Sequence, residues 1–207
     1  RSSDLERPNG VLVTPKTMSP EHKPQQYAIS QDLQIVHNLF SDFIATSKRQ
    51  QRDAEFRETL ADMRQRLVPI KIGRWGQVQE WQRDRDSRYS THRHIQHLFA
   101  AFPGSQITHE TPQLAQAAIT SLEARGVGRS GWSRAWRINI FARLGRADLA
   151  YRQIRKTLPG FHDHLIWQGK SQIDAPCGYA SGVCEMLLQS HRPLDDDASR
   201  FLIELLP

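Results

Sequence analysis

The stretch TPQLAQAAITSLEARG (111–126), followed after three residues by SGWSRAWRINIFARLG (130–145), decides the fold class. In the first stretch, Pro112 at the first helical position and Gly126 just past the end are start and stop signals of a helix. Apolar residues recur in both stretches at helical spacing. Two amphipathic helices joined by a short turn form a helical hairpin, so this stretch predicts an all-α fold.

The same spacing of apolar residues extends outward from this hairpin. Further helices are predicted over 30–44, 54–67, 94–102, 147–158 and 180–190. Only 201–206 is typical of a strand. The remaining long stretches, 1–29, 69–93 and 159–179, are predicted loops. Loops of that length in a helical domain usually carry function, so the search for a site starts in them.

Composition excludes several classes of protein. The 207 residues are 38% hydrophobic, which is enough for a packed core. The longest apolar run is about five residues, far short of the roughly 20 that a membrane-spanning helix needs. Cys177 and Cys184 allow at most one bridge, so the chain is no disulfide scaffold.

The net charge of +6 comes mostly from residues 48–93, which hold 12 basic and seven acidic side chains. A basic excess is compatible with a nucleic-acid or acidic-polymer partner. However, the acids are interleaved with the arginines, as in Arg83-Asp84-Arg85-Asp86. This pattern favours a solvated surface whose charges pair with one another, and we expect no nucleic-acid site there.

Two carboxylates stand beside prolines in predicted loops: Glu21 in SPEH (19–22) and Asp174 in QIDAP (172–176). A solvated turn carboxylate is the plainer interpretation of each. A carboxylate held in a stiff loop also suits a general acid or base, which must first be correctly positioned. Two such groups facing one polar pocket suggest glycoside hydrolysis.

Candidate sugar-binding side chains lie in three stretches that are rich in aromatic or histidine residues. Aromatic faces can stack on sugar rings, while guanidinium, imidazole and carboxylate groups can bind hydroxyls. The candidates are Trp75, Glu80 and Trp81 in GRWGQVQEW (73–81), Arg93 and His94 in HRHIQH (92–97), and Trp132 and Arg134 in SGWSRAW (130–136). Ordinary packing of the tryptophans and structural roles for the histidines remain open alternatives.

No metal or cofactor is expected. The spacing of His92, His94 and His97 lacks the cysteine or carboxylate that would complete a tetrahedral set, and we expect His97 to turn into the helix packing. The sequence holds no nucleotide-binding glycine fingerprint, P-loop or nucleophile elbow, so hydride, phosphoryl and serine-hydrolase chemistry have no support.

Six ordered motifs resemble glycoside hydrolase family 95, whose members are α-L-fucosidases with some α-L-galactosidases. The motifs are SPEH (19–22), IGRWGQVQEWQRD (72–84), HRHIQHLFAAFPGSQIT (92–108), the two helical stretches quoted above, and QID…EMLLQSH (172–191). The resemblance implies an (α/α)6 barrel and an inverting mechanism. Glu21 matches the general acid, Asp174 matches the base-side aspartate that polarises water-positioning asparagines, and Arg93 and His94 match a sugar-binding pair. The chain departs from the family pattern at 175–178, which reads APCG, and at 161–167.

The resemblance also implies that the chain is one part of a larger enzyme. We expect residues 1–191 to form the C-terminal part of the catalytic domain, and 192–207 a linker and the start of a β segment. The implied substrate is a fucosylated oligosaccharide or polysaccharide, and the implied location is extracellular or secretory, although no signal peptide is visible. The missing N-terminal half of the barrel would supply the asparagines, so we expect this chain alone to be inactive.

Two alternatives stay open. The first is a basic helical binding module that uses residues 71–93 to hold nucleic acid or an acidic polysaccharide. The second is a relative that binds sugar without cleaving it. Placement of Glu21 and Asp174 in one cleft with Trp75, Trp81 and Arg93 would favour the enzyme over the binding module.

Overall fold

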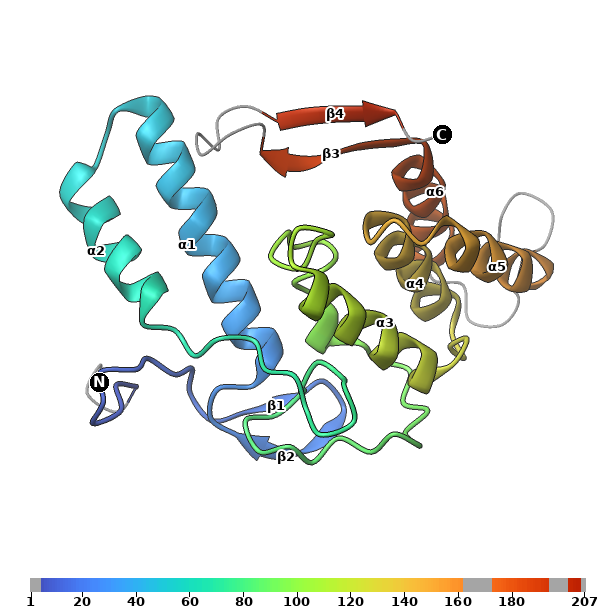
Figure 1. Cartoon of the computed structure of the whole chain (residues 1–207), viewed down its shortest axis with the longest axis horizontal. Coiled ribbons are helices and arrows are strands. Elements are labelled where there is room, and N and C mark those ends of the chain that lie inside the picture. The colour runs from blue at the N-terminus through green and yellow to red at the C-terminus, as the bar shows by residue number, and fades with distance from the viewer. Residues whose placement is uncertain (1–4, 162–172, 194–200, 206–207) are drawn as a thin grey trace.

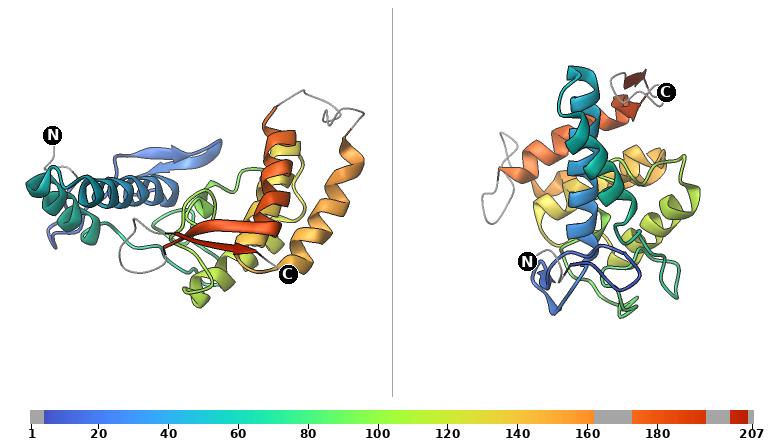
Figure 2. Two further views of the ribbon diagram at one scale, coloured as in Figure 1. Left: turned by 90° about the horizontal axis from the view of Figure 1, so that it is seen from above. Right: turned by 90° about the vertical axis from the view of Figure 1, so that its left-hand side faces the viewer.

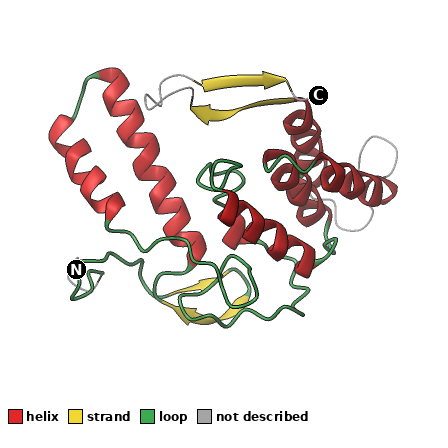
Figure 3. Cartoon of the chain, viewed as in Figure 1, coloured by secondary structure: helices red, strands yellow, loops and turns green. Residues whose placement is uncertain are grey.

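The computed structural model describes residues 5–161, 173–193 and 201–205, and this part of the chain is mostly helical (Figure 3). The decisive hairpin is α3 (Pro112–Arg125) followed by α4 (Gly131–Arg143). Pro112 occupies the first turn of α3, and Gly126 follows it with a φ of 69°, a left-handed conformation that glycine adopts without strain. The all-α prediction is confirmed.

The other helices also follow the predicted periodicity. They are α1 (Ser30–Gln50), α2 (Ala54–Gln65), α5 (Ala147–Thr157) and α6 (Asp174–Leu187). Short antiparallel strands accompany them: β1 (Thr17–Ser19) pairs with β2 (His22–Gln26), and β3 (Leu188–Pro193) pairs with β4 (Phe201–Leu205). Figure 1 shows the α1–α2 hairpin at one end and the α4, α5 and α6 group at the other.

Three predictions of local structure were wrong. The region 1–29 is not all loop, because it contains the β1–β2 hairpin. The last helix starts at Asp174 rather than 180, and the chain turns extended at Leu188 to pair with β4. The segment 94–102 is no α-helix and contains only a 3₁₀ turn, η2 (Gln96–Leu98). The backbone N–H of Ala100 donates to the Gln34 side chain, and its carbonyl accepts from Gln106 and Ile107, so these groups are unavailable for helical bonding.

The main core lies where α3, α4 and α5 meet the loop before them. It includes fully or almost fully buried Val78, Ile95, Leu98, Leu122, Ile138 and Ile140. A smaller cluster of Val13, Ala28 and Leu33 holds the N-terminal segment against the start of α1. The two further views in Figure 2 show the long α1–α2 hairpin extending away from the helices that form the main core.

Helices α4 and α6 run parallel and approach closely through two glycines. A Cβ added at Gly178 would lie 3.1 Å from the Ala135 Cβ, and one at Gly182 would lie 2.6 Å from the Ile138 Cγ2. The side chain of Asn139 donates to the Gly178 carbonyl at 2.8 Å, which fixes the register. Because Gly178 and Gly182 have no Cβ, α6 can pack closely against α4 at these two positions.

Two further findings bear on the chemistry and surroundings of the protein. Cys177 and Cys184, both on α6, are exposed free thiols. Among the described residues, no helix combines the length and apolarity needed to cross a membrane.

Candidate active site

The exposed carboxylate of Glu21 stands at the tip of the β1–β2 hairpin. Ser19 pairs with His22, so Pro20 and Glu21 form the turn between the strands. Glu21 has a φ of 55°, in the left-handed region that costs a residue other than glycine about 1–2 kcal/mol. Its side chain is 56% exposed. The fold therefore holds a solvent-facing carboxylate in an unfavourable backbone conformation, a feature that clusters at functional sites.

Two residues of the loop before η2 lie against this carboxylate. The Arg93 guanidinium donates to Glu21 Oε2, and His94 Nε2 lies 3.4 Å from the same oxygen. Partial burial lowers the pKa of His94, although the Glu21 charge acts in the opposite direction. His94 is therefore neutral at neutral pH. The structure brings together three of the residues that the sequence singled out.

A row of rings connects this carboxylate to α4. Trp81 meets His22 edge-on at 4.7 Å between ring centroids, and His22 stacks on His92 at 4.6 Å. His92 stacks on His94 at 5.1 Å, and His94 lies 4.9 Å from the ring of Trp132. The row runs from the hairpin to the first turn of α4 and forms an aromatic wall beside Glu21.

Behind the hairpin, the buried carboxylate of Glu80 ties the site together. Its Oε1 accepts from the Ser19 hydroxyl at 2.5 Å and the Gln96 amide at 2.6 Å, and its Oε2 accepts from Arg125 at 2.7 Å. His22 Nδ1 lies 3.3 Å from both oxygens. Glu80 thus joins the hairpin that carries Glu21, the η2 turn and the end of α3.

Electrostatics keep this centre charged. Burial alone would raise the pKa of Glu80, but the hydrogen bond from His22 and the positive charge of Arg125 outweigh it and lower the pKa to about 2. Burial and the neighbouring Glu80 charge raise the pKa of Asp86 to about 6. Burial lowers the pKa of His97 to about 3, so this fully buried imidazole is neutral and packs inside, as expected.

Two candidates, Glu80 and Trp81, are buried, and two others, Trp75 and Arg134, are half-buried and donate to backbone carbonyls. Glu80 has no exposed area and Trp81 is 4% exposed, so both support the site from behind and neither faces a ligand. The indole of Trp75 donates to the Asp86 carbonyl. Arg134 donates to the carbonyls of Gly128 and Lys156, which fastens α4 to the end of α5. The burial of Glu80 and Trp81 argues against direct sugar contacts for these two side chains.

Asp174 is exposed at the first position of α6. A negative charge there interacts favourably with the partial positive charge of the helix N-terminus.

Within the described residues, no three or more His, Cys, Asp or Glu side chains are grouped to hold a metal ion.

Sequence reasoning missed the residues that surround Glu80. Arg125 looks like an ordinary basic residue in the last helical turn, yet it is 7% exposed and also donates to the carbonyls of His92 and His94. Gln96 gives no sequence signal at all. Ser19 lies in a quoted motif, but nothing in that motif shows that its hydroxyl is buried.

The candidate site thus combines an exposed carboxylate, paired with a guanidinium and lying close to an imidazole, with a row of aromatic rings on a helical scaffold. Residues 3–187 match the family model described as the Glycosyl hydrolase family 95 catalytic domain. The chain belongs to this family. Its mostly helical architecture agrees with the (α/α)6 barrel that the family resemblance implies.

Curated relatives agree with this assignment. The chain is 32% identical to Alpha-L-fucosidase 2 of Arabidopsis thaliana, across 88% of this chain and 24% of the relative. It is 30% identical to Probable alpha-fucosidase A of Aspergillus niger, across 92% of this chain and 26% of the relative. It is also 30% identical to Probable alpha-fucosidase A of Aspergillus oryzae, across 92% of this chain and 29% of the relative. The chain thus spans about a quarter of the length of the curated relatives it matches.

Proposed function

We propose that this chain supplies the general acid and the base-side carboxylate of an enzyme that hydrolyses α-L-fucosidic bonds in glycans with inversion. The strained, exposed Glu21 carried by the β1–β2 hairpin is the observation that supports this best. In the reaction, Glu21 donates its proton to the glycosidic oxygen while the bond from that oxygen to the anomeric carbon breaks. Arg93 and His94 orient Glu21 and offer donors to sugar hydroxyls.

The register of α4 and α6 supports a base-side role for Asp174. Gly178 lies opposite Ala135, and α4 runs parallel to α6. One turn before Gly178 and Ala135, or about 6 Å back along each helix, Asp174 lies level with the first turn of α4. Trp132 of that turn contacts His94, which in turn contacts Glu21. The helix register therefore favours the same end of the molecule for both carboxylates.

An inverting enzyme needs room between its carboxylates for the attacking water. Water enters on the face of the sugar opposite the leaving oxygen, and its proton passes to the Asp174 side. An α-L-galactoside differs from an α-L-fucoside only by a hydroxyl at C6, so it is a second candidate substrate. We also propose that residues 1–191 belong to the catalytic domain, that 192–207 begin a further β segment, and that the protein acts outside the cell or in the secretory pathway.

The test uses the full-length protein and an α-1,2-linked fucoside. Glu21→Gln and Asp174→Asn should each lower kcat at least about 100-fold. Proton NMR of the first turnovers should show β-L-fucose as the initial product. Glu58→Gln on the exposed face of α2 is the matched control and should retain activity. Normal turnover by Glu21→Gln, or release of α-L-fucose first, would contradict the proposal.

A further inference from the structure

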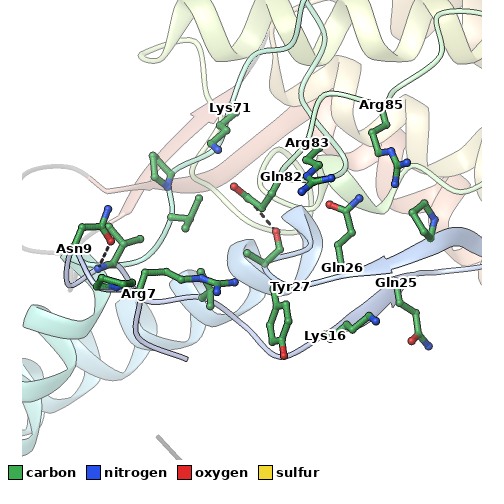
Figure 4. Close-up of a pocket in the computed structure, with 17 residues that line it drawn as sticks. Arg7, Asn9, Lys16, Gln25, Gln26, Tyr27, Lys71, Gln82, Arg83 and Arg85 are labelled. Carbon is green, nitrogen blue, oxygen red and sulfur yellow. Dashed lines mark hydrogen bonds between the residues drawn. The ribbon is translucent and has the colours of Figure 1, made fainter. Parts of the chain in front are cut away.

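A large open pocket lies at the base of the hairpin that carries Glu21. Its volume is about 970 Å³, and its walls come from the N-terminal segment, from β2 with the residues after it, and from the loop that follows α2 (Figure 4). The five charged side chains that line it are Arg7, Lys16, Lys71, Arg83 and Arg85. All five are basic and exposed, and no acidic residue lines the pocket.

The acids that alternate with these arginines face other partners. Asp84 accepts from the Arg74 backbone N–H and the Gln77 side chain, and the Asp86 carboxylate accepts from the backbone N–H of Glu80. Arg83 and Arg85 are left without an ion pair among the described residues. The expectation that this stretch pairs its own charges is therefore wrong for these two arginines. Their uncompensated charge, concentrated in a concavity, attracts anions.

The remaining lining suits a sugar. The Tyr27 ring is 43% exposed, with the Arg7 guanidinium carbon 5.1 Å from its centroid. Figure 4 shows the amides of Gln25, Gln26 and Gln82 among the basic side chains. The exposed part of the tyrosine ring can contact a pyranose ring, amides can bind hydroxyls, and guanidinium groups match carboxylate or sulfate oxygens in paired geometry.

We propose that this pocket binds an anionic sugar of the glycan that bears the fucose. The anionic group is a carboxylate or a sulfate ester, and the proposal rests on the function proposed above. Pro24 to Gln26 follow Glu21 by three to five residues. At about 3.3 Å per residue, the pocket lies roughly 10–17 Å along the strand from Glu21. A glycan held here can extend toward the hairpin tip. One exposed aromatic ring in a cluster of cations gives no series of stacking platforms for successive bases, which argues against single-stranded nucleic acid.

The first experiment measures binding without turnover. The full-length protein with Glu21→Gln is titrated calorimetrically with an oligogalacturonate, a sulfated oligosaccharide of equal length, the neutral fucosyllactose and an oligonucleotide of equal charge. We expect one or both acidic oligosaccharides to bind more tightly than the neutral one and the oligonucleotide. The stronger acidic ligand identifies carboxylate or sulfate as the natural group. Equal binding of acidic and neutral sugars, or preference for the oligonucleotide, would overturn the proposal.

The second experiment localises the binding. Arg7→Gln, Arg83→Gln and Arg85→Gln combined should weaken binding of the acidic oligosaccharide roughly 10- to 100-fold. The control combines Lys48→Gln, Arg49→Gln and Arg155→Gln, which removes the same charge from exposed sites outside the pocket. Equal weakening by both sets would overturn the proposal. Turnover of a small neutral fucoside should be unchanged in the pocket variant, so a failure of this inference is distinguishable from a failure of the proposed fucosidase activity.

Discussion

Replacing the buried Glu80 by Gln removes one negative charge at almost constant shape. Its carboxylate has no exposed area and accepts from Ser19, Gln96 and Arg125. A pKa lowered from 4.5 to about 2 corresponds to about 3 kcal/mol of stabilisation at neutral pH, at about 1.4 kcal/mol per pH unit. The variant also leaves Arg125 buried without its charged partner, and breaking such a pair typically costs about 3–5 kcal/mol.

The assay is calorimetric melting of the full-length protein, with and without Glu80→Gln. A loss of about 3 kcal/mol should lower the melting temperature of the catalytic domain by roughly 3–6 °C at pH 7, because the shift per kcal/mol becomes smaller as a domain becomes larger. Because the folded pKa of Glu80 is depressed, its contribution is complete above pH 4.5 and declines as the pH falls toward 2. At pH 3 the difference between wild type and variant should therefore fall to about half. Glu58→Gln serves as the exposed control.

A Glu80→Gln variant that melts within about 2 °C of wild type at pH 7 would refute this reasoning. A difference that stays constant from pH 7 to pH 3 would refute the electrostatic part of it, because a protonated Glu80 resembles glutamine.

The other predictions concern the hairpin tip, the α4–α6 contact and Asp86. Glu21→Gly should relieve the left-handed strain, so the melting temperature should hold or rise while kcat falls at least about 100-fold; parallel losses of both would show that Glu21 is structural. Gly182→Ala should destabilise by about 1–3 kcal/mol in thermal melts, since its Cβ would lie 2.6 Å from Ile138; a gain from the helix propensity of alanine would contradict the close packing. Because burial raises the pKa of Asp86 to about 6, the stabilising effect of its protonation is complete below pH 3.8 and disappears as the pH rises through 6. The stability of Asp86→Asn relative to wild type should therefore increase between pH 4 and pH 7. Thermal melts of both proteins at the two pH values measure this difference, and a decrease would contradict the prediction.

Local signals account for the parts of the fold that the sequence predicts well. Pro112 and Gly126 mark the ends of α3 because proline and glycine have distinct backbone limits. The start of α6 was harder to predict from the sequence, because Pro176 and Gly178 are typical of a loop. Proline is tolerated in a first helical turn, where its missing N–H has no helical partner. Gly178 is needed for the close approach to α4, which no local pattern reveals.

In the site, too, local motifs predicted some features, and others depend on contacts between distant segments. The motif residues Glu21, Arg93 and His94 are brought together as their resemblance to a known family implies. The burial of Glu80 and the role of Arg125 depend on contacts between segments far apart in the chain. Sequence alone therefore singled out Glu21, Arg93, His94 and Glu80, but it did not reveal that Glu80 is buried or that Ser19, Gln96 and Arg125 surround it.

We propose that Glu21 and Asp174 act on one glycosidic bond from opposite sides. A crystal structure of the full-length protein, with the distance between the two carboxyl groups measured, tests it most directly. We expect a shared cleft and a separation of roughly 6.5–9.5 Å, or somewhat more where an amide lies between Asp174 and the water. Carboxyl groups more than about 15 Å apart, on opposite faces of the molecule, would contradict it.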